Sequence, residues 1–291
     1  MKIVMLGHSG VGKTSYMVSM YGRLLEPIQG FSVRCRRKSD HRDLKGLYRE
    51  LGSGHYPAAT DQRSSYKLTL RFKGKGILPF TWVDYRGDSL RQRKDRDDAK
   101  RLIQDLRSAD GLLAFFDCDA LARGGPNPGI GRMVYLLTRA FEELDNPVPF
   151  ALVCTKADLV ETLSDHHLRP IEGLIDVVRA SDRIIGTLVP VACGAQPYQV
   201  EMPVLFLLHY GLLTSGHRCL GEMEASASRA REYRDRSGII DDFFSWLGGE
   251  PTYRELADRE EVAIEASSRE AKSLMKSARR LGGVIEGLPV F

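Results

Sequence analysis

Residues 2–14 read KIVMLGHSGVGKT, and this stretch decides the fold. Its first part, Lys2–Leu6, is a short apolar run of the kind that forms a buried strand. The remainder, 7–14, fits the pattern GxxxxGK[ST], in which glycines let backbone N–H groups curl around phosphates at a helix N-terminus. Because a strand precedes the motif and a helical pattern follows it, we favour a phosphate-binding loop over a chance match in a glycine-rich turn.

The side chains of this loop have separate expected roles. Lys13 is expected to reach the β- and γ-phosphates and to act as a catalytic cation, and the hydroxyl of Thr14 is expected to bind magnesium. The other residues expected to contact the nucleotide here are Gly7, Ser9, Gly10, Val11, Gly12 and Ser15.

A second motif follows the apolar segment Phe80–Val83, where Asp84-Tyr-Arg-Gly87 gives DxxG. An acid at the tip of a buried strand can hold magnesium through water, and Gly87 can offer its N–H to a γ-phosphate. The motif is weak by itself, but beside a phosphate-binding loop it indicates that Asp84 is a metal-binding residue.

A third motif, Thr155-Lys156-Ala157-Asp158, follows the strand expected at 150–154. Asp158 can accept two hydrogen bonds from guanine N1 and N2, whereas adenine has no such donor pair. The stem of Lys156 can lie along the base. The alternative is that Asp158 only caps a helix. Three signatures at three strand ends together favour a guanine-nucleotide site.

Apolar runs that alternate with helical patterns predict an α/β fold, a mostly parallel six-stranded sheet with helices on both faces. The predicted strands are 2–6, 65–73, 77–84, 111–117, 150–154 and 185–191. The predicted helices are 13–25, 89–108, 130–144, 166–180 and 201–214. The turn at 73–76 predicts a hairpin and one antiparallel edge strand.

Two segments do not follow this alternation. Residues 26–60 form a basic insertion before the second expected strand, and 218–291 read as a C-terminal helical extension in which Pro251 opens a helix. We therefore predict a nucleotide-binding domain at 1–217 and an extension at 218–291. The basic residues between Arg34 and Arg49 are either a solvated face or a surface for acidic protein, phospholipid or RNA, and we favour the solvated face.

Composition limits the class of protein. Of the 291 residues, 43% are hydrophobic and the net charge is +4, which does not imply a nucleic-acid partner. The five cysteines are scattered, as in a cytoplasmic protein with reduced thiols. The most apolar stretch, 200–213, is too short for a transmembrane segment, so we expect a soluble protein.

Over residues 1–215 these motifs resemble the P-loop GTPases of the translation-factor and Ras-like class. More narrowly, Pro57-Ala-Ala-Thr60 and Asp84-Tyr-Arg-Gly87-Asp88 resemble the bacterial double-GTPase and conflict-system type. The resemblance implies GTP or GDP with Mg²⁺ as ligands. It also implies that Thr60 is a catalytic and metal-binding switch residue and that the Cys193 N–H meets guanine O6. Many relatives act as nucleotide-dependent dimers, which makes a homodimer an expectation.

The chain departs from this class at three positions. Asp88 stands where many members have a water-orienting glutamine, and Ser9 where a glycine is common. Thr155 replaces an asparagine whose amide ties the base-binding loop to the phosphate-binding loop, so we expect that tie to be lost. Side chains that could compensate for the missing catalytic groups, although a solvated role is favoured for each, are Arg63, Arg86 and His8.

The sequence therefore predicts a regulatory GTPase, slow without a partner, whose Mg-GTP state controls binding to a protein through the switches, the insertion or the tail. An alternative is a nucleotide-gated interaction module that binds GTP with little hydrolysis. A third hypothesis, an ATPase mechanoenzyme, is disfavoured by Asp158.

Overall fold

The computed structural model describes residues 1–58, 64–84, 104–124, 128–142, 144, 147–237 and 251–291. The chain forms two compact units. The first comprises Met1–His209 with Leu281–Phe291, and the second comprises Tyr210–Arg280. The predicted domain boundary at residue 217 lies within a helix of the second unit and stays a prediction.

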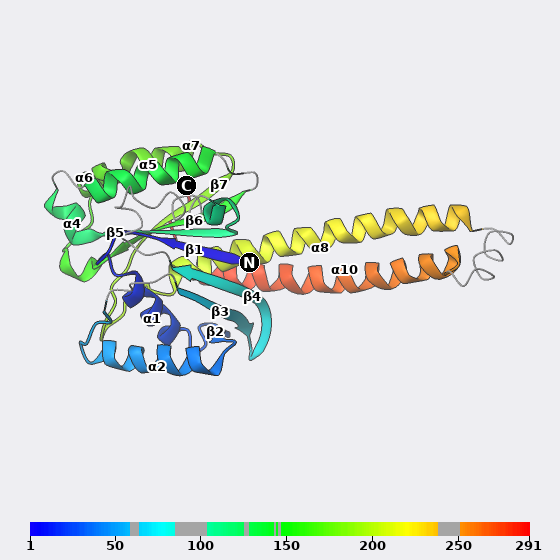
Figure 1. Ribbon diagram of the computed structural model, residues 1–291, viewed down its shortest axis with the longest axis horizontal. Helices are drawn as coiled ribbons and strands as arrows, with labels where there is room; N and C mark the ends of the chain where they lie inside the picture. Colours follow the sequence, from blue (N-terminus) through cyan, green and yellow to red (C-terminus); the bar gives the residue numbers. More distant parts are fainter. Residues whose placement is uncertain (59–63, 85–103, 125–127, 143, 145–146, 238–250) are drawn as a thin grey trace. The chain divides into compact units, whose positions relative to one another are not determined.

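The first unit is built on a seven-stranded sheet of order β2-β3-β4-β1-β5-β6-β7 (Figure 1). β1 lies at the centre, parallel to β4 on one side and to β5 on the other. Because the carboxyl ends of parallel strands meet at one sheet edge, the ends of β1, β4 and β6 lie together there. The strands are β1 Lys2–Leu6, β2 Phe31–Cys35, β3 Ser64–Phe72, β4 Lys75–Asp84, β5 Gly111–Asp117, β6 Val148–Thr155 and β7 Ile184–Pro190.

Helices cover both faces of this sheet, with α1 and α2 on one face and α5 and α7 on the other (Figure 1). The predicted α/β architecture with helices on both faces is therefore confirmed. The helices of the chain are α1 Lys13–Arg23, α2 Lys38–Gly52, α4 Cys118–Arg123, α5 Pro128–Glu142, η2 Ala157–Leu159, α6 Asp165–Leu168, η3 Arg169–Ile171, α7 Glu172–Ala180, α8 Met202–Arg236 and α10 Tyr253–Val284.

The insertion contains regular structure that the sequence pattern did not predict. β2 pairs antiparallel with β3, so the sheet has seven strands rather than six, and β3 is not the antiparallel edge strand that was expected. Phe31 and Val33 are fully buried and, two positions apart on a strand, point to the same face, while Ser32 between them is also buried. The predicted turn between β3 and β4 is confirmed, with Lys73 and Gly74 at φ 47° and 81°.

Several helices begin or end at other residues than the sequence predicted. The helix expected at 166–180 is divided into α6, η3 and α7, with Pro170 at the break. The helix expected to end at 214 continues as α8 to Arg236. Pro251 precedes α10, whose start is capped reciprocally by Thr252 and Glu255 at 3.0 and 3.2 Å. Most of the helix expected at 89–108 lies outside the described residues.

The outer edge of β7 is covered by the last residues of the chain. The Gly186 N–H donates to the Phe291 carbonyl oxygen at 2.8 Å, and the Phe291 N–H donates back at 2.9 Å. The Thr187 hydroxyl also donates to the Pro289 carbonyl oxygen at 2.7 Å. This edge of the sheet is therefore already hydrogen-bonded.

In the second unit, parts of α8 and α10 pack antiparallel. Arg229 donates through Nε to Glu260 at 2.9 Å, and closer to residue 210 a Cβ on Gly216 would lie 2.8 Å from the sulfur of Met275. Small side chains such as Ala230, Ala257 and Ala271 are buried along this contact. Among the described residues, no helix is both long and apolar enough to cross a bilayer.

Candidate functional site

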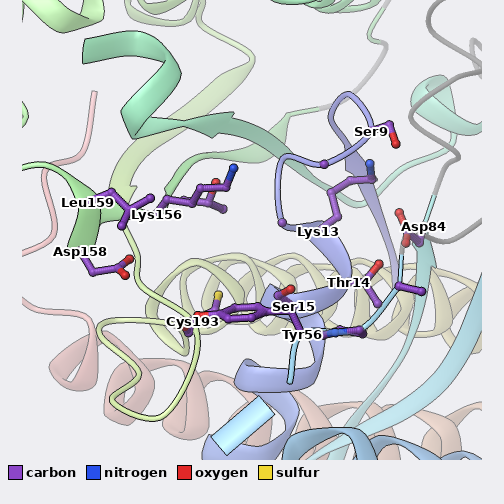
Figure 2. A pocket seen from close by; sticks show the side chains of 15 residues that line it. Ser9, Lys13, Thr14, Ser15, Tyr56, Asp84, Lys156, Asp158, Leu159 and Cys193 are labelled. Atoms are coloured by element: carbon purple, nitrogen blue, oxygen red, sulfur yellow. Dashed lines mark hydrogen bonds between the residues drawn. The ribbon is translucent and has the colours of Figure 1, made fainter. Parts of the chain in front are cut away.

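A cavity of about 530 Å³ opens at the carboxyl edge of the sheet in the first unit. Its wall combines the loop after β1, the end of β4, the loop after β6, the loop after β7 and the segment after α2 (Figure 2). The lining residues are Ser9, Gly10, Gly12, Lys13, Thr14, Ser15, Tyr56, Pro57, Ala58, Asp84, Thr155, Lys156, Asp158, Leu159 and Cys193. The fold therefore brings described residues of all three sequence motifs to one cavity.

The loop at 7–14 depends on its glycines. Gly10 and Gly12 have φ of 79° and 94°, the left-handed region that side chains disfavour. A Cβ on Gly7 would lie 2.8 Å from Val11 Cγ1, so the loop can close only around a bare backbone. Gly12 precedes α1 and provides no side-chain cap, so the positive end of the helix dipole faces the loop and favours an anion there.

Lys13 is held over this loop. Its side chain is 8% exposed, and its Nζ donates to the carbonyl oxygens of Gly7 at 2.7 Å and His8 at 3.2 Å. Thr14 and Ser15 follow in the first turn of α1 and line the cavity. Gly7 and Val11 do not line it, so their contribution is to the shape of the loop.

Asp84 lies at the end of β4, paired in register with Met5 of β1. It is 3% exposed, and its Oδ1 has no hydrogen-bond partner among the described residues. Burial raises its pKa to about 6, although Lys13 nearby lowers it. A buried carboxylate oxygen without a partner, close to the cation of the loop, fits a hard divalent ion with oxygen ligands.

Figure 2 shows Lys13, Thr14 and Asp84 at one end of the cavity and Lys156, Asp158 and Leu159 at the other. Thr155 connects the loops that carry these two ends. Its hydroxyl donates to the Val11 carbonyl oxygen at 2.6 Å and lies 3.1 Å from that of Phe116. The expected loss of the tie between the two loops is therefore wrong, because the hydroxyl reaches the backbone directly.

The side chain of Lys156 is fixed by a partner that sequence reasoning missed. Its Nζ donates to Asp117 Oδ2 at 2.5 Å, while Asp117 Oδ1 accepts from the N–H groups of Asp119 and Ala120 at 3.0 and 3.2 Å. Asp117 thus caps α4 and orients Lys156 at once. The available signal was an acid directly at the end of β5.

Asp158 lies on η2 with an exposed side chain, and no hydrogen bond among the described residues uses its carboxylate. The alternative reading as a helix cap finds no support, because η2 has no side-chain cap. The Ala157 N–H donates to the Val191 carbonyl oxygen at 3.1 Å, which joins this loop to the one that carries Cys193.

Cys193 stands at the same end of the cavity. Burial and the nearby Asp158 raise the pKa of its thiol to about 12, so the sulfur stays neutral near pH 7. In the part of the chain that the structure describes, its backbone N–H donates to no other group. The position is consistent with the N–H donor expected for a guanine oxygen.

Tyr56 also lines the cavity, which the sequence analysis did not predict. Its hydroxyl donates to the Cys193 carbonyl oxygen at 3.3 Å, across 137 positions of sequence. The close approach requires Gly194, at φ 130°, because a Cβ there would lie 2.9 Å from the Tyr56 hydroxyl. The signal in the sequence was an aromatic residue just before Pro57.

Several predicted residues lie outside the described part of the chain. They are Thr60, Gly87, Asp88, Arg63 and Arg86. His8 is described, and its Nδ1 lies 2.8 Å from the Ser9 carbonyl oxygen, but it does not line the cavity.

Comparison with known proteins places this geometry in a family. Among solved structures, the chain is similar to the GTPase-like domain of Ski7 from S. cerevisiae, which was crystallised with GTP. The identity is 14% and the TM-score 0.42, over 66% of this chain and 42% of that chain. No curated protein matches.

The family described as Double-GTPase 2 matches residues 2–177, which hold the phosphate-binding loop, Asp84 and the motif at 155–158. This agrees with the resemblance stated from the motifs, and it supports GTP binding. Since the match spans more than half of the chain, the protein belongs to the Double-GTPase 2 family.

Proposed function

We propose that this chain is a magnesium-dependent GTPase that acts as a regulatory switch and hydrolyses GTP slowly without a partner. The observation that supports this most is the convergence of Lys13, Asp84 and Asp158 on one cavity. Each residue has the chemistry for a different part of the ligand: the phosphates, the metal ion and the base.

At the phosphate end, the backbone N–H groups of the loop and the ammonium of Lys13 bind the β- and γ-phosphates. Lys13 is nearly buried, so its charge is poorly screened and acts strongly on the negative charge that develops during transfer. Phosphoryl transfer depends mainly on such positioning and charge stabilisation. Lys13 is therefore proposed as a catalytic residue.

Thr14 and Asp84 are proposed to hold Mg²⁺, together with Thr60 as the sequence predicts. The unpartnered, buried Oδ1 of Asp84 is what makes this site fit the ion. When bound, the ion neutralises charge on the β- and γ-phosphate oxygens. Thr14 lines the cavity beside Lys13 and carries the hydroxyl ligand.

At the base end, Asp158 accepts hydrogen bonds from guanine N1 and N2, and the Lys156 stem packs along the ring. The contact between Lys156 and Asp117 fixes the far end of that side chain. The Cys193 N–H is proposed to donate to O6. Adenine lacks the donor pair that Asp158 requires, so the site is proposed to select guanine.

The switch itself is proposed for the segments that contain Thr60 and Asp84–Asp88, ordered by GTP and released by hydrolysis. The output would be a change in affinity for a protein partner. A second candidate, GTP binding with little hydrolysis, is favoured by Ser9 in the cavity wall and by Asp88 in the sequence.

Single-turnover hydrolysis by protein preloaded with GTP and magnesium tests this proposal. Turnover within minutes would show that the chain supplies its own catalytic groups. GTP that remains intact for hours, and stays intact with cell extract added, would favour the second candidate. No detectable GTP binding would contradict both.

A further inference from the structure

α2, within the basic insertion, carries a row of exposed cations. Lys38, Arg42, Lys45 and Arg49 follow the spacing i, i+4, i+7, i+11, and all four are exposed. At 100° per residue they fall within about 60° of the helix surface, over about 16 Å of its length. None forms an ion pair or side-chain hydrogen bond with another described residue. We call these four residues the cationic row.

The row is presented by a helix that is fixed on its other side. The ring of Tyr48 packs directly on Gly22 of α1, where a Cβ would lie 2.2 Å from the ring. The Tyr21 hydroxyl lies 2.7 Å from His41 Nδ1, and Leu44 is buried. α2 therefore lies along the outer side of α1, as Figure 1 shows, and turns the cationic row outward.

The end of the row is close to the nucleotide cavity along the chain. The turn after α2 is closed by hydrogen bonds from the Ser53 N–H to the Arg49 carbonyl oxygen at 3.2 Å and from the His55 N–H to that of Glu50 at 3.0 Å. Tyr56 follows at once and enters the cavity wall. The row therefore ends seven residues before Tyr56, a residue that contacts the proposed base loop.

Three features of α2 favour a protein partner over a membrane or nucleic acid. Asp43 and Glu50 are exposed about a quarter to a third of a turn from the row, so a broad field of phosphates would meet carboxylates as well. The apolar side chains Leu44 and Leu51 are buried, and the half-buried Leu47 lies about half a turn from the row, which leaves no apolar side chain beside the cations to enter a bilayer. No exposed aromatic side chain lies between the cations to stack on bases.

We propose that the cationic row is the docking surface for an acidic helix of a protein partner, with carboxylates at the matching spacing i, i+4, i+7, i+11. The inference rests on the proposed function, in that this partner is the one whose binding the nucleotide state controls. A single row of carboxylates pairs with the four cations and avoids Asp43 and Glu50. Such pairing gives specificity and salt-dependent association.

The probe is a fluorescent helical peptide of about 18 residues, long enough to span the row, with Glu at the four matching positions. Anisotropy with the full chain should show saturable binding that weakens as salt is added. Arg42→Glu/Lys45→Glu should lower the affinity about tenfold or more, since attraction becomes repulsion at two positions. The matched control is Arg231→Glu/Lys272→Glu, which changes two exposed cations of the second unit and should leave binding intact.

A peptide with Lys at the four positions should bind the Arg42→Glu/Lys45→Glu protein better than the wild type, which also shows that the variant is folded. Equal loss in the control variant would overturn the proposal, because bulk charge would then explain binding. The proposal would also be overturned if the wild-type protein bound anionic vesicles, or an RNA of about 20 nucleotides, more tightly than the peptide and if Arg42→Glu/Lys45→Glu abolished that binding.

Protein loaded with GTP or with GDP separates this inference from the proposed function. Peptide binding that differs between the two forms supports both. Row-dependent binding that is equal in the two forms supports the docking surface and contradicts the switch. Absence of peptide binding from protein that binds GTP normally overturns the docking surface alone.

Discussion

The hydroxyl of Thr155 donates to the Val11 carbonyl oxygen at 2.6 Å, and this hydrogen bond joins the proposed base and phosphate ends of the cavity. Thr155 is 1% exposed, so the bond is shielded from water. A small hydroxyl at this position performs a connection that a longer amide performs elsewhere in the class, because the two loops approach closely enough.

Replacement of Thr155 by Val should destabilise the protein by about 1–3 kcal/mol, since the buried Val11 carbonyl loses its donor. Nucleotide affinity should fall as well. Thermal unfolding with and without GDP measures both effects. Thr155→Ser keeps the hydroxyl and is the control, and equal behaviour of the two variants would contradict the role of this hydrogen bond.

Lys13→Ala should abolish tight GTP binding, because the nearly buried ammonium is the cation held over the loop. Titration with a fluorescent GTP analogue measures the loss. Exposed Lys75 on β4 offers a matched control as Lys75→Ala, with affinity unchanged. Tight GTP binding by the Lys13 variant would remove Lys13 from the site.

Asp158→Asn should reduce the preference for GTP over ATP, by up to roughly 10⁴-fold if the carboxylate makes both contacts with the base. Competition between the two nucleotides gives the ratio directly. The exposed neighbour Glu161, as Glu161→Gln, removes a similar charge and should leave the ratio unchanged. Unaltered selectivity in the Asp158 variant would place the guanine contact elsewhere.

Asp84→Asn should stabilise the nucleotide-free protein above pH 6. Burial raises the pKa of Asp84 in the folded protein from the ordinary aspartate value of 3.8 to about 6, so ionisation of this carboxyl opposes folding. The loss of folding free energy caused by this ionisation is absent below the ordinary aspartate pKa and grows as the pH rises towards 6. Above pH 6 it reaches its full size, on the order of 1–3 kcal/mol.

Urea unfolding at pH 4 and pH 7.5 should therefore show that Asp84→Asn has a higher free energy of unfolding than the wild type only at pH 7.5. The same variant should lose the dependence of GTP affinity on magnesium. A variant that is less stable at pH 7.5 would show that the ionised carboxylate has a stabilising partner. Full magnesium dependence would exclude Asp84 as a ligand.

Tyr56→Phe should speed GDP release by about two- to tenfold, because it removes one hydrogen bond of ordinary strength to the Cys193 loop. Stopped-flow release of a fluorescent GDP analogue measures the rate. Tyr135 on α5 is also exposed, and Tyr135→Phe should have no effect. An unchanged rate for the Tyr56 variant would mean that its hydroxyl does not retain the nucleotide.

Sequence reasoning predicted those parts of the site that depend on residues close together in the sequence. Gly10, Gly12 and Lys13 act within one loop and one helix turn, and their spacing alone specifies the geometry. Asp84 and Asp158 were identified because each belongs to a short motif at the end of an apolar strand. These positions converge once parallel strands are assumed.

What was missed depends on contacts between distant parts of the chain. Tyr56 reaches Cys193 and Lys156 reaches Asp117 across 137 and 39 positions, and neither pair leaves a periodic pattern. β2 was missed because a five-residue strand with Arg34 near its end gives a weak alternation. The prediction for Thr155 was wrong because it compared threonine with asparagine by residue type alone. It did not take into account how closely the base-binding and phosphate-binding loops approach each other.

The pairing of Gly186 with Phe291 covers part of the outer edge of β7. An open strand edge is a template for the addition of foreign strands, and here the backbone groups of β7 around Gly186 and Thr187 already have partners. Removal of residues 287–291 would expose that template beside the buried side chains of β7. A protein without residues 287–291 should therefore aggregate during purification before any loss of nucleotide affinity is seen.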